Sequence, residues 1–163
     1  MKKNLTLLIV LLVSLSCSNS KKKKSTIIES RYLYSSTLDS IKMRTEFKLV
    51  KTITDTLIHY KYKSESDSTR NFEIYYKLKT ESLFLNSEEY KIFKENSLQY
   101  LENPEVWFDD YRMAEPIIDG IEPIMFNSEY GILAITGALN PTHFFLAKKN
   151  DTLIVKKILE RLY

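Results

Sequence analysis

The chain has 163 residues, of which 44% are hydrophobic and 28% charged, enough for one compact domain and unlike a disordered or collagen-like polymer. Six of its 24 basic residues are lysines within the first 24 positions, where no acid occurs. Residues 25–163 therefore carry 18 basic and 21 acidic residues, a net charge of −3, although the whole chain has a net charge of +3. A mildly acidic body argues against a nucleic-acid partner.

The N-terminus has the pattern of an export signal. Lys2 and Lys3 precede the apolar run LTLLIVLLVSL, whose eleven residues are fewer than the about 20 that a membrane-spanning helix needs. The residues VSLSC at positions 13–17 resemble a bacterial lipobox. This resemblance implies that residues 1–16 are a lipoprotein signal peptide, and that Cys17 becomes the lipidated first residue of the mature protein. Cys17 is the only cysteine, so the exported body has no disulfide bond.

Residues 17–25 are predicted to form a basic, flexible tether between the lipid and the body. After the cysteine this segment has no apolar residue, and its four lysines are expected to be attracted to anionic headgroups. The residue after the cysteine is Ser18, and not the aspartate that at this position would resemble the inner-membrane retention signal of enteric bacteria. The tether is basic, whereas an acidic tether would resemble the surface-export signals of the Bacteroidota. We therefore expect an envelope protein anchored in the outer membrane and facing the periplasm.

Residues 26–163 are predicted to form a single globular domain that begins with β-strands. Apolar and polar residues alternate with period two over residues 43–49, 56–63 and 72–79, which predicts three antiparallel strands, and residues 82–85 can add a short fourth. The polar stretch SESDSTRN at 64–71 is predicted to be an exposed loop. The tyrosines of these strands suit an ordinary sheet face, with a binding interface as the alternative: Tyr60, Tyr62, Tyr75 and Tyr76.

The middle of the chain is predicted to be helical. Asn86 followed by acids is typical of a helix N-terminus, and a second helix is predicted over 105–114. A central strand is predicted over 130–136, followed by a hairpin of strands at 143–147 and 152–158. The predicted fold is therefore α+β, with an N-terminal meander and a C-terminal hairpin group in one antiparallel sheet and one or two helices packed on it. A partly closed β-barrel is the alternative.

One segment concentrates aromatic and acidic side chains. It consists of Trp107, Phe108, Asp109, Asp110 and Tyr111, and further acids follow it up to Glu122. On a helix, Trp107 and Tyr111 would share one face and pack in the core. The side chains of Asp109 and Asp110 would diverge by about 100°, so the two carboxylates could not act together on one bond of a substrate. We predict that the segment is core packing with solvated acids, and a partner-binding surface is its functional alternative.

No cofactor and no metal site are expected. The two histidines, His59 and His143, lie in different strand groups without a metal-binding spacing, and the body lacks cysteine. His59 is predicted to face solvent, and His143 to be a hydrogen-bonded structural residue at the start of a strand. The body also lacks GxSxG and the glycine-rich nucleotide motifs, so an enzyme is not expected, although a Ser–His–Asp triad has no fixed spacing.

The expected function is that of a membrane-anchored, non-catalytic binding or structural module that contacts another envelope component. The anchor on Cys17 makes the membrane one partner, and an envelope protein is expected as a second. The composition, rich in Lys, Ile, Tyr and Asn, resembles that of small lipoproteins of the Bacteroidota and implies no activity. The alternatives are a toxin-neutralising immunity lipoprotein and an envelope hydrolase that uses acids between Asp109 and Glu122.

Overall fold

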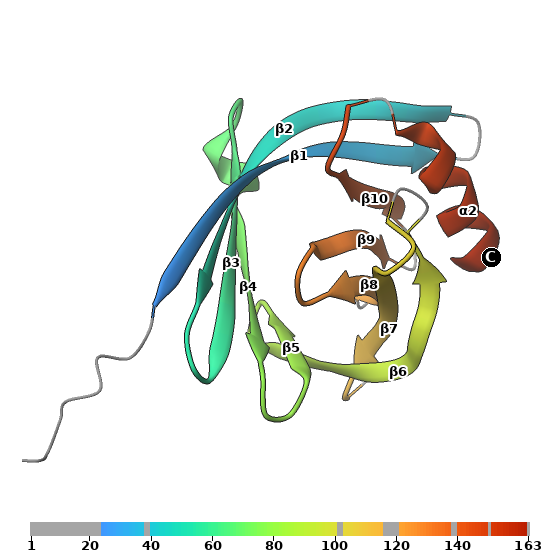
Figure 1. Ribbon diagram of the computed structural model, residues 1–163. Coiled ribbons are helices and arrows are strands. Elements are labelled where there is room, and N and C mark those ends of the chain that lie inside the picture. The colour runs from blue at the N-terminus through green and yellow to red at the C-terminus, as the bar shows by residue number, and fades with distance from the viewer. Residues whose placement is uncertain are drawn as a thin grey trace, which may run out of the picture.

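The protein is a closed antiparallel β-barrel. The computed structural model describes residues 24–37, 40–100, 103–115, 121–137, 140–149 and 151–162, so the predicted signal peptide and Cys17 lie outside the described residues. Within these residues, ten strands follow one another around a ring, each paired with its neighbours in the chain (Figure 1). The ring closes where β1 pairs with β10, with Tyr32 opposite Leu146 and Ser36 opposite Thr142.

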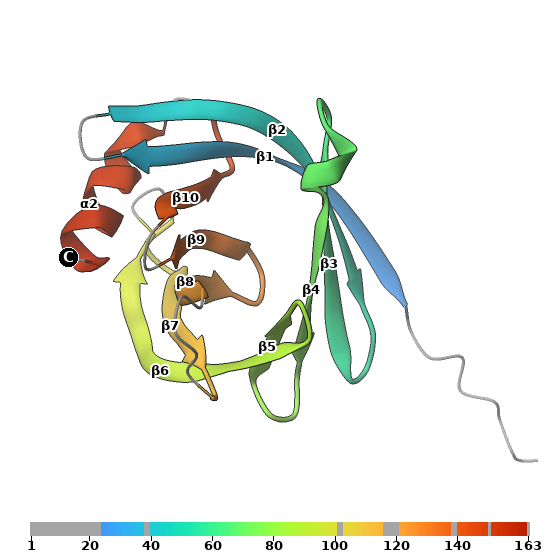
Figure 2. The ribbon, with the colours of Figure 1, turned by 180° about the vertical axis from the view of Figure 1, so that it is seen from behind.

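The strands alternate in direction, so their connections alternate between the two ends of the barrel. Their bounds are β1 (Ser25–Thr37), β2 (Ser40–Ile53), β3 (Leu57–Ser64), β4 (Phe72–Lys77), β5 (Ser82–Leu85), β6 (Glu88–Gln99), β7 (Trp107–Met113), β8 (Ile121–Asn127), β9 (Gly131–Gly137) and β10 (Asn140–Leu146). A short 3₁₀ helix, η1 (Ser68–Arg70), lies between β3 and β4. The helix α2 (Thr152–Leu162) lies outside the ring of strands (Figure 2). Among the described residues, none belongs to a helix both long and apolar enough to cross a membrane.

The predicted α+β fold is therefore wrong. The predicted strands at 43–49, 56–63, 72–79 and 82–85 lie within or overlap β2 to β5, and the strand at 130–136 corresponds to β9. The two predicted central helices are instead the strands β6 and β7, and the predicted last strand is the helix α2. A partly closed barrel, the alternative, comes nearer, but pairing between β1 and β10 closes the ring.

The sequence of β6 predicts a helix and not a strand because its alternation of apolar and polar residues is interrupted. Its register with β7 shifts between Ile92 and Lys94 and again before Leu98, and Asn96 has a φ of 47°. Tyr90 is buried in the barrel, whereas Phe93, three residues later, is 63% exposed. The β-bulges thus shift side chains between faces, which removes the period of two that identifies a strand.

Helix α2 packs against the outer face of the barrel wall. Its buried side chains Ile154, Val155 and Ile158 have helical spacing and contact a cluster that includes Phe144 and Leu133. Each fully buried aliphatic side chain contributes about 1.5–3 kcal/mol, so these three contribute much of what holds a short helix to the wall. The wall beneath α2 is consequently apolar on both faces.

The barrel interior is an aromatic core. Tyr60 and Tyr62 of β3 are 0% exposed, and Tyr76 of β4 is also buried among interior residues. Tyr75, by contrast, points outward and is 42% exposed. Burial raises the pKa of Tyr60 and of Tyr62 far above the ordinary value of 10, so both phenols keep their protons and act as neutral hydrogen-bonding groups.

Polar side chains inside the barrel bind the β8–β9 turn at the end away from η1. The ammonium of Lys51 donates to the carbonyl of Glu129 (2.5 Å), and the guanidinium of Arg31 donates to the carbonyl of Tyr130 (2.8 Å). Tyr60 donates its hydroxyl to the carbonyl of Ser128 (2.5 Å). These bonds satisfy buried donors, as a low-dielectric interior requires, and they fix the turn across the barrel.

Candidate functional site

A cavity opens at the end of the barrel where β1 ends and β2, β4 and β10 begin. We call it the mouth cavity. It has a volume of about 420 Å³ and is lined by Leu33, Ser35, Arg44, Phe47, Arg70, Phe72, Pro141, His143 and Phe145. Its volume falls in the range of about 300–1,000 Å³ that is typical of small-molecule sites. Among the residues that the structure describes, the lining combines apolar side chains with two arginines and contains no carboxylate.

Three phenylalanines form the apolar floor of the mouth cavity. Phe47, Phe72 and Phe145 come from β2, β4 and β10, and their ring centroids lie 5.5–6.0 Å apart with edge-to-face angles. Tyr62 stacks on Phe72 at 4.5 Å. Edge-to-face and offset stacked pairs are the favoured arrangements of aromatic rings, so the floor is a fixed surface rather than a loose group of side chains.

A β-bulge places Arg44 at the rim of the mouth cavity. In the β1–β2 pairing, Leu33 lies opposite Thr45 and the next residue, Tyr34, lies opposite Met43, so Arg44 is an extra residue in β2. A bulge of this kind redirects a side chain that regular alternation would send elsewhere. Arg44 is exposed, lines the cavity and belongs to no ion pair among the described residues.

Arg70 reaches the mouth cavity from η1, and Asp67 fixes that turn. The Asp67 carboxylate accepts hydrogen bonds from the backbone N–H (3.0 Å) and the hydroxyl (2.6 Å) of Thr69, and from Nε of Arg70 (3.2 Å). The bonds from Thr69, followed by the nearby Arg70 charge, hold the pKa of Asp67 below its ordinary value. The carboxylate therefore stays ionised and orients Arg70 through Nε.

Ser35 and His143 form the polar wall of the mouth cavity. They are cross-strand partners in β1 and β10, and Oγ of Ser35 lies 2.9 Å from Nδ1 of His143. Burial, reinforced by the positive charge of Arg44, lowers the pKa of His143 below 6.5. No hydrogen bond among the described residues engages the other ring nitrogen, so the pair lacks the orienting third group of a catalytic triad.

The coupling between Arg44 and His143 can be measured. We expect a nuclear magnetic resonance titration to give a His143 pKa below 6.5, and Arg44→Gln to raise it because a neighbouring positive charge is removed. A lowered pKa means that the unfolded chain binds the proton more tightly, so His143 contributes less to stability as the pH falls below 6.5. The His59 resonance is the internal control. A His143 pKa that Arg44→Gln leaves unchanged would contradict the placement of the arginine.

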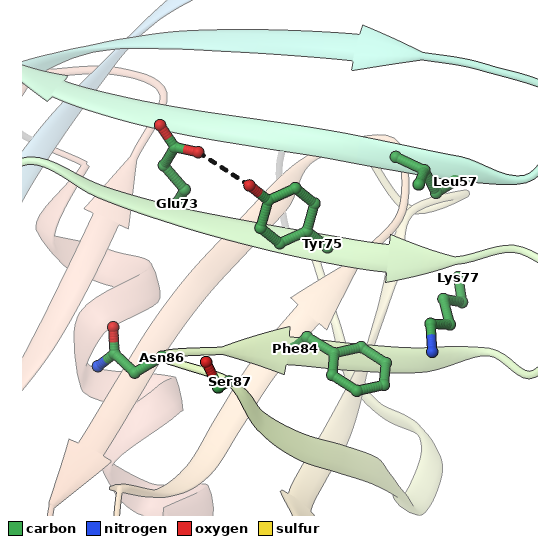
Figure 3. Close-up of a pocket in the computed structure, with 7 residues that line it drawn as sticks. All are labelled: Leu57, Glu73, Tyr75, Lys77, Phe84, Asn86 and Ser87. Atoms are coloured by element: carbon green, nitrogen blue, oxygen red, sulfur yellow. Dashed lines mark hydrogen bonds between the residues drawn. The ribbon is translucent and has the colours of Figure 1, made fainter.

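A second hollow lies on the outer face of β3, β4 and β5. We call it the outer groove; it has a volume of about 530 Å³ and is lined by Leu57, Glu73, Tyr75, Lys77, Phe84, Asn86 and Ser87 (Figure 3). Tyr75 lies opposite Phe84 in the β4–β5 pairing and stacks on the His59 ring at 4.2 Å. The ammonium of Lys77 lies 4.1 Å from the centroid of the Phe84 ring. The groove is thus an aromatic surface with polar side chains at its margin.

The carboxylate in the outer groove is already engaged by its neighbours. Glu73 accepts hydrogen bonds from Tyr75 (3.1 Å), as Figure 3 shows, and pairs with His59 (2.7 Å) and Lys61 (3.0 Å). The bond from Lys61, followed by those from His59 and Tyr75, lowers the pKa of Glu73 to about 2. These contacts leave the carboxylate little capacity for a ligand.

A third hollow, of about 520 Å³, lies at the opposite end of the barrel beside the β8–β9 turn. Its buried cations already have partners in the protein. Arg31 pairs with Glu29 (2.5 Å) and lies 4.4 Å from the centroid of the Tyr130 ring, and Lys51 donates to the carbonyl of Glu129. In the mouth cavity, by contrast, Arg44 has neither an ion pair nor a carbonyl partner among the described residues.

The segment Trp107–Tyr111, predicted to be core or a partner surface, lies in the strand β7, and its side chains are divided between the two faces of that strand. Phe108 packs in the cluster beneath α2, whereas Tyr111 lies in the barrel interior. Trp107 is 39% exposed, so its predicted place in the core is wrong. Asp109 accepts a hydrogen bond from the backbone N–H of Asn96 (2.7 Å), and Asp110 is buried next to Arg112 (3.4 Å). The prediction that both acids are solvated is therefore wrong for Asp110.

The structure brings together residues that the sequence did not connect. Ser35 and His143 are separated by 108 positions, and Arg44 and Arg70 come from two further elements. The one feature of the sequence that indicates this site is His143, which we predict to be hydrogen-bonded at the start of a strand. In the described part of the chain, no group of three or more His, Cys, Asp or Glu side chains is placed to hold a metal ion.

Comparison of the chain with models of protein families, with curated proteins and with solved structures finds no match.

Proposed function

We propose that the protein is a membrane-anchored, non-catalytic binding module of the cell envelope, and that its barrel binds a small ligand in the mouth cavity. The observation that carries this proposal is the fixed floor of Phe47, Phe72 and Phe145 beneath an open rim. Apolar walls with a few convergent polar groups are typical of small-molecule sites. The Ser35–His143 pair supplies such polar groups at the wall of the cavity.

Two aromatic residues of β4 allow a matched test of where the ligand binds. Phe72 lies on the floor of the mouth cavity, and Tyr75 lies in the outer groove on the opposite face of the same strand. An uncharged fluorescent naphthylamine probe should bind with enhanced emission. We expect Phe72→Ala to weaken binding about tenfold or more, since burial of one aromatic ring involves more than 1.4 kcal/mol, and Tyr75→Ala to leave it unchanged. The reverse result would move the site to the outer groove.

The anchor is the second part of the proposal. The lipobox-like residues before Cys17 and the lysines that follow it support attachment to the envelope through a lipid on this cysteine. We expect a fatty-acid analogue fed to the cells to label the wild-type protein. Cys17→Ala should abolish labelling and either release the protein from membranes or leave its signal peptide uncleaved. Absence of label on the wild type would contradict the anchor.

A second candidate function, neutralisation of a toxin by an immunity lipoprotein, is favoured by the outer groove. Tyr75 is 42% exposed, and Asn86 and Ser87 present polar side chains beside it (Figure 3). Exposed tyrosine surrounded by adaptable polar groups is typical of protein-binding surfaces. If this function holds, Tyr75→Ala should weaken capture of a toxin by the anchored protein, whereas Phe72→Ala should not.

A further inference from the structure

We propose that the ligand of the mouth cavity is a single apolar chain with an oxyanionic head group, such as a fatty acid. This inference rests on the proposed function and adds the chemical class of the ligand. The head group would lie between Arg44 and Arg70 at the rim, and the apolar chain would lie on the phenylalanine floor. The charged part of such a molecule would thus contact the charged side chains of the lining, and its apolar part would contact the apolar side chains.

The two arginines of the mouth cavity indicate that the head group of the ligand is an anion. Arg31, Arg70 and Arg112 each pair with a carboxylate, whereas Arg44 has no such partner among the described residues. Asp67 engages Arg70 only through Nε, which leaves the terminal N–H groups of that guanidinium without a bond to this carboxylate. Guanidinium groups bind carboxylates and phosphates through paired, charge-assisted hydrogen bonds. The described part of the lining holds no carboxylate that would compete with the head group.

The phenylalanine floor indicates that the ligand also has a hydrocarbon chain and is not a small hydrophilic anion. Phe47, Phe72, Phe145 and Leu33 line the same cavity as the two arginines, and Phe72 is the most exposed of the three phenylalanines. Phosphate or acetate alone would leave the exposed part of this lining, above all Phe72, in contact with water. A chain laid over them removes apolar area from water, at about 25 cal/mol per Å². The same chain lowers the local dielectric around the ion pair and so strengthens it.

The test compares two ligands that differ only in the head group. Calorimetry would measure the binding of decanoate and of decan-1-ol to residues 18–163, which include every described strand and α2. We expect decanoate to bind at least about tenfold more tightly, because charge-assisted hydrogen bonds are the stronger kind. Arg44→Gln should remove most of this difference and leave the affinity for decan-1-ol unchanged. Arg70→Gln should do the same to a smaller degree, because Asp67 already offsets part of its charge.

Lys48→Gln is the matched control, since it removes one positive charge from an exposed side chain of the same strand outside the cavity. It should leave both affinities unchanged. Equal affinity for decanoate and decan-1-ol, or an effect of Lys48→Gln as large as that of Arg44→Gln, would overturn the anionic head group while leaving the proposed function intact. Failure of both ligands to bind would overturn the proposed function as well. Binding to phosphatidylglycerol vesicles without binding of decanoate would assign the arginines to a bilayer surface and overturn the proposal.

Discussion

Tyr62→Ala is expected to destabilise the barrel by about 3–5 kcal/mol, the range typical of a large aromatic side chain removed from a packed core. The side chain is 0% exposed, stacks on Phe72 at 4.5 Å and meets the Phe145 ring edge-on at 5.3 Å. Its hydroxyl also accepts a hydrogen bond from the backbone N–H of Ile132 (2.9 Å). The substitution would open a cavity below the ligand floor and leave a buried donor without a partner.

Urea denaturation of residues 18–163 would measure this loss, and two further variants separate its causes. Tyr62→Phe keeps the ring but removes the acceptor of the Ile132 N–H, and should cost about 1–3 kcal/mol. Tyr75→Ala, a tyrosine on the outer face of the adjacent strand, should cost about 1 kcal/mol or less because the side chain is 42% exposed. A Tyr62→Ala variant no less stable than Tyr75→Ala would contradict the interior placement of Tyr62.

Gly131→Ala is expected to cost about 2–4 kcal/mol, from a strained backbone and a steric conflict. Gly131 begins β9 with a φ of +92°, a conformation that favours glycine. A β-carbon at this position would lie 2.6 Å from the hydroxyl oxygen of Tyr62, which the ring stack holds in place. The added methyl group would therefore displace Tyr62 and weaken its bond to Ile132.

A double-mutant cycle tests this cause of the Gly131→Ala effect. In the Tyr62→Phe background the hydroxyl is absent, so Gly131→Ala should cost about 1 kcal/mol less than in the wild type, as expected for residues in contact. Strictly additive free energies of unfolding would show that the conflict with the hydroxyl does not exist. A wild-type-like stability of Gly131→Ala alone would contradict both the strained backbone and the close contact.

The parts of the fold that the sequence predicts are those with uninterrupted alternation. In β3, Ile58, Tyr60 and Tyr62 point inward and their neighbours point outward, so the local pattern is sufficient to identify the strand. In β6, the register shifts near Phe93 and Leu98 remove that pattern. In α2, the sequence analysis predicts a strand, although the spacing of Ile154, Val155 and Ile158 matches one buried face of a helix.

Closure of the barrel and assembly of the mouth cavity could not be predicted. Both depend on pairing between β1 and β10, which are separated by about a hundred residues, and no local pattern encodes such a pairing. Arg44 is in turn the extra residue of a bulge in β2, and local alternation does not show where a bulge falls. Residue types alone pointed instead to Trp107–Tyr111, whose side chains the strand divides between its two faces.

The most direct test of the account is a backbone amide chemical-shift map of ¹⁵N-labelled protein titrated with decanoate. We expect the largest shifts at residues that line the mouth cavity on three separate strands, Ser35, Arg44 and Phe145. The Tyr75 and Phe84 amides of the outer groove should stay unchanged. Shifts centred on Tyr75 and Phe84, or no shifts at a decanoate concentration that saturates the calorimetric signal, would contradict it.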